Sequence, residues 1–285
     1  MKPIEIPVVG IGPGSQPAET DGATLDYLVM PREMDTYTPT MLPEPEAVVG
    51  LHAGMDKLRR LHDRLAVFRV GAGSEVIDLS DLDVANRSLV DQALGEGEVS
   101  VRYAGPREAH IQETRLAGVW RVQMRGAHGG LQRDTLEIAD IPALVRHTAF
   151  DGAREHLALA PEVPDGVLNA PPVLVELLDR SAAWRPGQEA HVVNLTLLPQ
   201  TEADLAYLQA QLGQGPVTLL SRGYGNCRIS ATGLAHVWWV QHFNSEDKLI
   251  LDTLVVTDVP AEALAAQEDI EDSAARLAEI LDALT

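Results

Sequence analysis

One short segment combines two arginines, a tyrosine, an asparagine and a cysteine, side chains that can bind a partner or react. It is Ser-Arg-Gly-Tyr-Gly-Asn-Cys-Arg-Ile, residues 221–229. Two glycines around Tyr224 permit a tight hairpin joint that holds the Tyr and Asn side chains outward, because glycine adopts backbone conformations that other residues avoid. The pattern is typical of a turn with a small buried thiol, or of a recognition loop with polar contacts from two arginines and the tyrosine. The candidate partner-binding residues here are Arg222, Gly223, Tyr224, Gly225, Asn226, Cys227 and Arg228.

Cys227 is the one cysteine of the chain. A nucleophilic thiol needs a base held within reach, and the sequence supplies no clear candidate. A single thiol forms no intramolecular disulfide, which fits a reducing compartment, and it cannot alone build a four-ligand zinc or iron–sulfur site. We therefore predict no catalytic residue, no metal site and no cofactor. A carrier of metal or iron–sulfur clusters that combines Cys227 with ligands from a partner stays open.

The remaining motifs predict no enzyme. The sequence has no C-x-x-C, H-E-x-x-H or G-x-S-x-G motif and no P-loop lysine. Glycines 10, 12 and 14 do not have the dinucleotide-binding spacing, and Pro13 lies where a helix start would have to donate amides. His236 and His242 lie six residues apart, which places them on one strand face but too far apart to share a metal ion easily.

Composition excludes several classes of function. The 285 residues include 45% hydrophobic residues and carry a formal net charge of −20. Phosphate binding needs a Lys/Arg surface, so we expect no nucleic-acid partner. An acidic surface serves solubility or attracts basic partners. The N-terminus lacks a signal-peptide pattern, and no stretch approaches the roughly 20 apolar residues of a membrane span, so we predict a cytoplasmic protein without membrane insertion.

The chain contains two diverged copies of one unit, which appear when it is compared with itself at an offset of 118 residues. Gly97 opens the first copy of the matching stretch and Gly215 the second, and no gap is needed across it. Roughly a third of the aligned pairs are identical, which is far above chance. The triplet Asp-Thr-Leu at 134–136 recurs at 252–254, and Trp120 recurs as Trp238.

Hydrophobic periodicity predicts the elements of each copy. In the first copy we expect helices over 44–65 and 83–94, strands over 75–79, 98–103, 109–116, 118–125 and 131–139, and a helix start at Asp140 with Pro142. In the second copy we expect helices over 171–184 and 202–212, strands over 190–196, 216–221, 226–232, 235–243 and 248–256, and a closing helix after Asp258-Val-Pro260.

These elements predict an α+β fold, a tandem repeat of two similar units that are each a helix-flanked, mainly antiparallel β-sheet. Residues 1–43 are expected to form an extended N-terminal arm, 44–158 the first unit, 159–170 a linker rich in proline, and 171–285 the second unit with its closing helix. Whether the two units share one sheet or pack face to face stays open.

One sheet face differs between the copies. Because neighbours on a strand point to opposite faces, Trp120, Val122 and Met124 share a face that we expect to be core. On the other face, apolar residues of copy two replace polar residues of copy one: Leu220, Trp239, Phe243, Ile250 and Val255 stand for Arg102, Arg121, Arg125, Gln132 and Glu137. An apolar sheet face marks burial against the rest of the protein, a homodimer, or client binding. Trp239 and Phe243 therefore join the candidate partner-binding residues.

Copy two resembles the C-terminal conserved region of the hydrogenase expression/formation proteins HupH, HyaF and HoxQ. The resemblance rests on residues 221–229, on Val-Trp-Trp-Val-Gln at 237–241 followed by Phe-Asn-Ser, and on Asp-Lys-Leu-Ile-Leu-Asp-Thr-Leu at 247–254. The opening Ile-Pro-Val-Val-Gly-Ile-Gly-Pro-Gly-Ser-Gln, residues 6–16, is similar to the N-terminus of the same family.

The resemblance implies a cytoplasmic, non-catalytic accessory protein in the maturation of uptake [NiFe]-hydrogenase. The implied partner is the immature iron–sulfur small-subunit precursor, with its cationic and then apolar twin-arginine signal peptide as one candidate contact. A thioredoxin-like maturation factor is an alternative partner, which would make the protein a structural adaptor, and a homodimer stays open.

Overall fold

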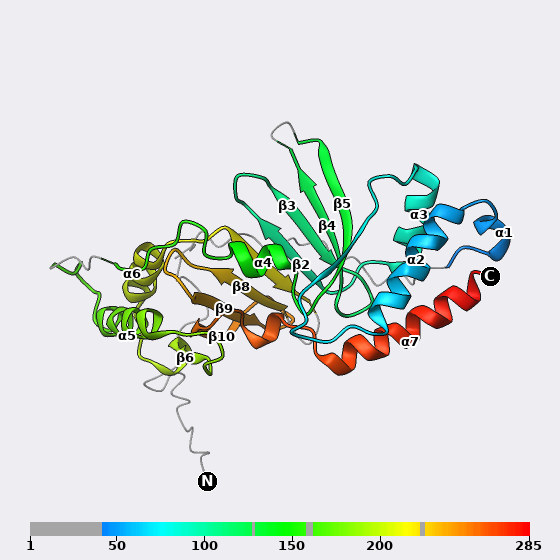
Figure 1. The fold of residues 1–285 in the computed structure, drawn as a ribbon. Helices are drawn as coiled ribbons and strands as arrows, with labels where there is room; N and C mark the ends of the chain where they lie inside the picture. The colour runs from blue at the N-terminus through cyan, green and yellow to red at the C-terminus, as the bar shows by residue number, and fades with distance from the viewer. Residues whose placement is uncertain (1–41, 127–128, 158–161, 223–225) are drawn as a thin grey trace, which may run out of the picture. The chain divides into compact units, whose positions relative to one another are not determined.

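Ten antiparallel strands form one continuous sheet in the computed structural model, which describes residues 42–126, 129–157, 162–222 and 226–285. Residues Thr40–Thr285 form one compact unit. The strand order is β1-β5-β4-β3-β2-β7-β8-β9-β10-β6, so β1 and β6 are the two edges (Figure 1). The expected N-terminal arm lies outside the described residues except for its last two. None of the described helices is long and apolar enough to cross a membrane.

The first repeat runs from α1 to α4. Its elements are α1 Pro45–Val48, α2 His52–Leu65, β1 Glu75–Asp78, α3 Val84–Leu94, β2 Val99–Tyr103, β3 Ala109–Glu113, β4 Val119–Arg125, β5 Leu131–Ile138 and α4 Ala143–Thr148. The expected helix over 44–65 is wrong as one piece. It is divided at Gly50, whose backbone φ of +90° lies in the left-handed region that ends helices.

The second repeat has the same order of elements. They are α5 Ala170–Ala183, β6 His191–Asn194, the 3-10 turn η1 Leu195–Leu197, α6 Glu202–Leu212, β7 Val217–Ser221, β8 Asn226–Ala231, β9 Val237–Phe243, β10 Leu249–Val256, the 3-10 turn η2 Ala261–Ala263 and α7 Gln267–Ala283. Here a 3-10 turn follows Pro260, so the closing helix begins later than the proline predicts. Residues 158–161 of the expected linker lie outside the described residues.

The repeats meet edge to edge through β2 and β7, which answers the question that the sequence left open. In this pairing Val101 lies opposite Leu219, its own counterpart at the offset of 118. Val99 and Tyr103 lie opposite Ser221 and Val217, so the pairing is symmetric about the Val101–Leu219 pair. The two halves of the sheet are therefore related by an approximate twofold axis through this pair.

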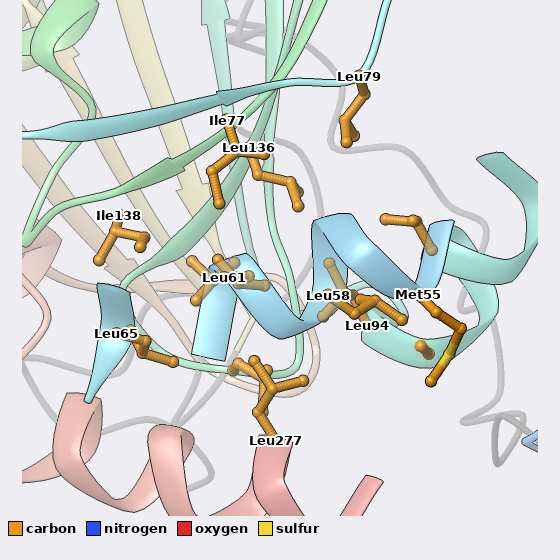
Figure 2. Packing of buried hydrophobic residues seen from close by; sticks show 14 of the residues in the cluster. Met55, Leu58, Leu61, Leu65, Ile77, Leu79, Leu94, Leu136, Ile138 and Leu277 are labelled. Atoms are coloured by element: carbon orange, nitrogen blue, oxygen red, sulfur yellow. The ribbon is translucent and has the colours of Figure 1, made fainter. Parts of the chain in front are cut away.

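Helices cover one face of each half of the sheet. In repeat one, the apolar stripe of α2 packs on this face together with α3 and α7. Figure 2 shows Ile77, Leu136 and Ile138 of the strands beside Leu61 of α2, with Leu277 of α7 across the helix. The C-terminal helix thus leaves its own repeat and packs on the other one. In repeat two, α5 and α6 cover the same face through Leu174, Leu177 and Leu208.

The opposite face holds the core that the two repeats share. Trp120 and Trp238 are fully buried there, and their indole N–H groups donate to the backbone oxygens of Ala139 and Asp258 at 3.0 Å each. Residues of α4 and η2 close this core, together with those of both sheet halves. The paired tryptophans and Val122 therefore mark the buried face, as strand alternation predicts.

The face predicted for Val255 is wrong. Val255 lies opposite Trp238 in the β9–β10 pair and belongs to the shared core. Its neighbour Leu254 lies opposite Trp239 on the helix-covered face. Alternation assigns faces within one strand, but only the register between strands says which residues of β10 share a face with Trp239.

Candidate partner-binding surface

Two hairpin ends of repeat two lie side by side at one end of the sheet. The segment 222–225 joins β7 to β8, and the turn Asn244–Lys248 joins β9 to β10. The Asn226 side-chain amide donates a hydrogen bond to Asp247 Oδ1 at 2.8 Å, which ties the two ends together. Gly223, Tyr224 and Gly225 lie outside the described residues, so the position of the predicted recognition loop is defined by its two flanks.

The β9–β10 turn is held by its own first residue. Asn244 Oδ1 accepts hydrogen bonds from the backbone N–H groups of Glu246 and Lys248, both at 2.9 Å. Asp247 adopts a left-handed backbone with a φ of +58°, a conformation that Asp tolerates better than most residues. The strands expected over 235–243 and 248–256 leave this joint between them, and its Asn and Asp are residue types that favour such a turn.

Arg228 and Phe243 lie on the helix-covered face of the sheet near these hairpin ends. The Arg228 guanidinium carbon lies 5.9 Å from the centroid of the Phe243 ring, which is a cation–π distance. Arg228 is buried and Phe243 is half-buried. Arg222 is exposed, and its backbone N–H donates to the Glu98 oxygen of repeat one. The two predicted arginines therefore lie in different environments.

Trp239 packs within its own repeat. Its ring is half-buried against the core formed by α5 and α6, and its indole N–H donates to Asp252 Oδ1 at 2.5 Å. The counterpart in repeat one is the ion pair of Arg121 with Asp134, which also includes Asp91. Burial raises the pKa of Asp252, and the hydrogen bonds from Trp239 and Gln241 oppose that rise.

Cys227 faces the shared core and is buried. Burial, with a smaller contribution from the charge of Glu262, raises the pKa of its thiol to about 12. The thiolate, which is the form that attacks electrophiles and binds metals, is therefore scarce at neutral pH. Within the described ranges no three His, Cys, Asp or Glu side chains are grouped so that they could hold a metal ion.

His236 lies in the turn before β9, so the prediction that it shares a strand face with His242 is wrong. His236 stacks on Trp184 with 4.1 Å between ring centroids, and it lies 5.5 Å from Phe150. Its backbone φ is +62°, and its counterpart in repeat one is Gly118 at +76°. Burial lowers the pKa of His236, and the nearby Asp258 opposes this change. His236 is thus part of an aromatic cluster at a strained turn.

Comparison with known proteins assigns the family. The family described as HupH hydrogenase expression protein, C-terminal conserved region, matches this chain twice, over residues 53–161 and 167–284. The chain belongs to the HupH family. Because the family's conserved region matches twice, each repeat of this HupH-family protein corresponds to one copy of it, which confirms the tandem repeat.

Curated relatives named for hydrogenase expression or a hydrogenase operon match most of the chain. The hydrogenase expression/formation protein HupQ of Azotobacter chroococcum mcd 1 is 51% identical and covers 96% of both chains. The hydrogenase expression/formation protein HupH of Rhodobacter capsulatus is 44% identical and covers 98% of both. The hydrogenase-1 operon protein HyaF of Escherichia coli (strain K12) is 36% identical over 72% of this chain and 71% of the relative.

Proposed function

We propose that this HupH-family protein is a cytoplasmic accessory protein of hydrogenase formation that binds the immature iron–sulfur small subunit before its export. Membership of the family supports the role in hydrogenase formation, because the relatives HupQ and HupH are named for it. The observation that carries the finer proposal is the difference between two repeats built on one scaffold. Repeat two has a Tyr and a Phe at hairpin-end positions where repeat one has Pro106 and Arg125.

The proposed contact surface consists of the hairpin ends of repeat two, that is Arg222 to Arg228 with Phe243, and Trp239 as its support. Tyr and Arg are the residue types most often responsible for binding energy at protein interfaces. The described flanks are held in place by the Asn226–Asp247 hydrogen bond and by the Arg228–Phe243 contact.

Charge supports a cationic partner. Residues 162–285 carry 18 Asp and Glu against 6 Lys and Arg, whereas residues 44–157 carry 18 against 14. Repeat two is therefore the more acidic half, and long-range attraction of a basic segment would favour it. A precursor with a cationic and then apolar leader has the complementary chemistry.

The double variant Tyr224→Ala with Phe243→Ala tests the contact surface. Affinity capture of the small-subunit precursor by the tagged full-length chain is expected to fall at least tenfold, because two ring contacts at the hairpin ends are lost. The matched control replaces the counterparts in repeat one, Pro106→Ala with Arg125→Ala, and we expect it to leave capture unchanged.

The proposal is wrong if both double variants capture the precursor like the unchanged chain while their thermal unfolding also matches it. Capture of a thioredoxin-like maturation factor in place of the precursor would support the adaptor function instead.

A further inference from the structure

The two edge strands of the ten-stranded sheet, β1 and β6, occupy equivalent positions in the two repeats but differ in their side chains. Strand β1 pairs with β5, and strand β6 pairs with β10; within the described residues neither has a second partner strand. The outer side of an edge strand presents backbone N–H and C=O groups that can pair with another chain. Proteins block such pairing with charged residues on the edge or use it to bind an extended segment.

Strand β1 contains two carboxylates, whereas the one titratable side chain of strand β6 is His191, which lies 2.7 Å from Glu176. Strand β1 is Glu-Val-Ile-Asp, and its Glu75 forms an ion pair with Arg64. The equivalent strand β6 is His-Val-Val-Asn, without a carboxylate, Lys or Arg. Val192 of β6 and its counterpart Val76 of β1 are both exposed, so the two strands differ in charge and not in this apolar residue. Strand β1 thus has a carboxylate at each end, whereas strand β6 has none of its own.

Apolar side chains extend the β6 edge along the sheet. Turn η1 follows β6 directly, and the backbone N–H of Asp252 donates to Thr196 Oγ1 at 2.8 Å, which holds η1 against β10. Leu197 of η1 is 80% exposed, and Ile250 at the bulge of β10 is 56% exposed. We call Leu197 and Ile250 the edge patch; Val192, which lies opposite Val255, belongs to the other face of the sheet.

Repeat one supplies a polar version of the same edge. Ser80 binds the backbone N–H of Asp134 as Thr196 binds that of Asp252. The counterpart of Leu197 is Asp81, which forms an ion pair with Lys57, and the counterpart of Ile250 is Gln132. The same scaffold therefore folds with polar residues at these two positions, so folding alone does not require the apolar ones.

We infer that the β6 edge and the edge patch accept an extended segment of a partner protein as an additional strand, with apolar residues in the segment and Lys or Arg beside them. Two copies of this chain both carry a net charge of −20 and repel each other, which disfavours a second copy as occupant. Glu189, two residues before β6, and Glu202, the first residue of α6, are exposed and form no ion pair with a described residue, so they can attract a basic segment. This inference stands whether or not the hairpin ends bind the small subunit.

The test uses the isotope-labelled full-length chain and a short peptide of alternating Thr and Val with two Lys at each end. Amide hydrogen exchange followed by NMR is expected to show at least tenfold slower exchange for the outward amides of β6 when the peptide is present. A peptide with Glu in place of Lys is expected to bind at least tenfold more weakly, because the net charge of −20 and the exposed Glu189 and Glu202 would repel it.

The double variant Leu197→Asp with Ile250→Gln installs the residues of repeat one and is expected to weaken peptide binding at least tenfold. Its matched control is Val67→Glu, which adds a charge at an exposed apolar site of repeat one and should change nothing.

Several results would overturn the inference. One is peptide binding without added protection of β6, and another is equal affinity for the Lys-flanked and Glu-flanked peptides. Protection of the outward β6 amides in the free monomer would mean that the chain covers its own edge. Protection that grows with protein concentration, together with a dimer mass in light scattering, would mean that a second copy occupies it.

Discussion

Asp134 and Asp252 occupy equivalent positions in the two repeats, but one binds a charged side chain and the other an aromatic one. Asp134 forms an ion pair with Arg121, whereas Asp252 accepts a hydrogen bond from the indole of Trp239. A buried carboxylate needs a partner, and either a cation or an N–H donor satisfies it. Repeat two has thus exchanged a cation for an aromatic ring without losing the hydrogen-bonding arrangement on which the strand depends.

The protonation of Glu113 should make the free energy of unfolding of the whole protein depend on pH. Burial raises its pKa from 4.5 to about 7, the backbone N–H of Gly118 opposes the rise, and Glu98 and Asp269 add to it. Because the folded state holds this proton more tightly than the unfolded state, the contribution of Glu113 to stability is present below about pH 4.5 and is lost as pH rises towards 7.

Glu113→Gln should therefore raise the free energy of unfolding at pH 8 by about 1 to 3 kcal/mol, and it should flatten the fall in stability between pH 5 and pH 7. Urea unfolding at several pH values measures this. The counterpart in repeat two is the buried Ala231, so an uncharged side chain fits the scaffold. A variant with the same pH slope as the unchanged chain would show that Glu113 keeps its ordinary pKa.

At this scale the sequence identified the right strand faces for the tryptophans but not the partners of individual side chains. Alternation placed Trp120 and Trp238 in the core, because it needs only one strand at a time. It misplaced Val255, since the register between β9 and β10 is a long-range property. The repeated triplet Asp-Thr-Leu identified Asp252 as the counterpart of Asp134. Its hydrogen bond with Trp239 could not be predicted, because it depends on the fold.

The C-terminal helix α7 links the last element of the chain to the first repeat. Its Ile270, Ala274 and Leu277 belong to the core of α2 and α3. Gly118 lies directly beneath it, and a Cβ at this position would meet Ile270 Cγ1 at 2.6 Å. The sequence predicted this helix from its apolar stripe. It could not predict that the stripe packs on the other repeat, because a stripe shows which face is buried and not against what.

Gly118→Ala should therefore destabilise the protein by at least about 3 kcal/mol, since it combines a left-handed φ of +76° with a clash against α7. The control is Gly129→Ala, which has the same φ of +76° with nothing within 4 Å of the added methyl group. We expect that control to cost only about 1 kcal/mol. Equal losses of unfolding free energy in the two variants would show that α7 does not pack closely on Gly118.

At the scale of the whole molecule, two copies of the family's conserved region form one sheet with an approximate twofold axis. The duplication could be predicted from sequence, because a fixed offset of 118 aligns identical residues. The pairing of β2 with β7, which joins the two repeats, could not be predicted. Both segments have the pattern of ordinary strands, and the fold decides which strands pair. Because the repeats are equivalent, each residue of repeat one serves as a control for its counterpart in repeat two. The contact surface and the edge patch both consist of positions at which the two repeats have different residue types.

The most direct test of the central claim places a photo-crosslinking amino acid at Phe243 in repeat two or at its counterpart Arg125 in repeat one, in the full-length chain co-expressed with the hydrogenase small-subunit precursor. The account predicts a crosslinked product with the precursor from position 243 and none from position 125. Equal crosslinking from both positions, or none from position 243 while the precursor is present, would contradict it.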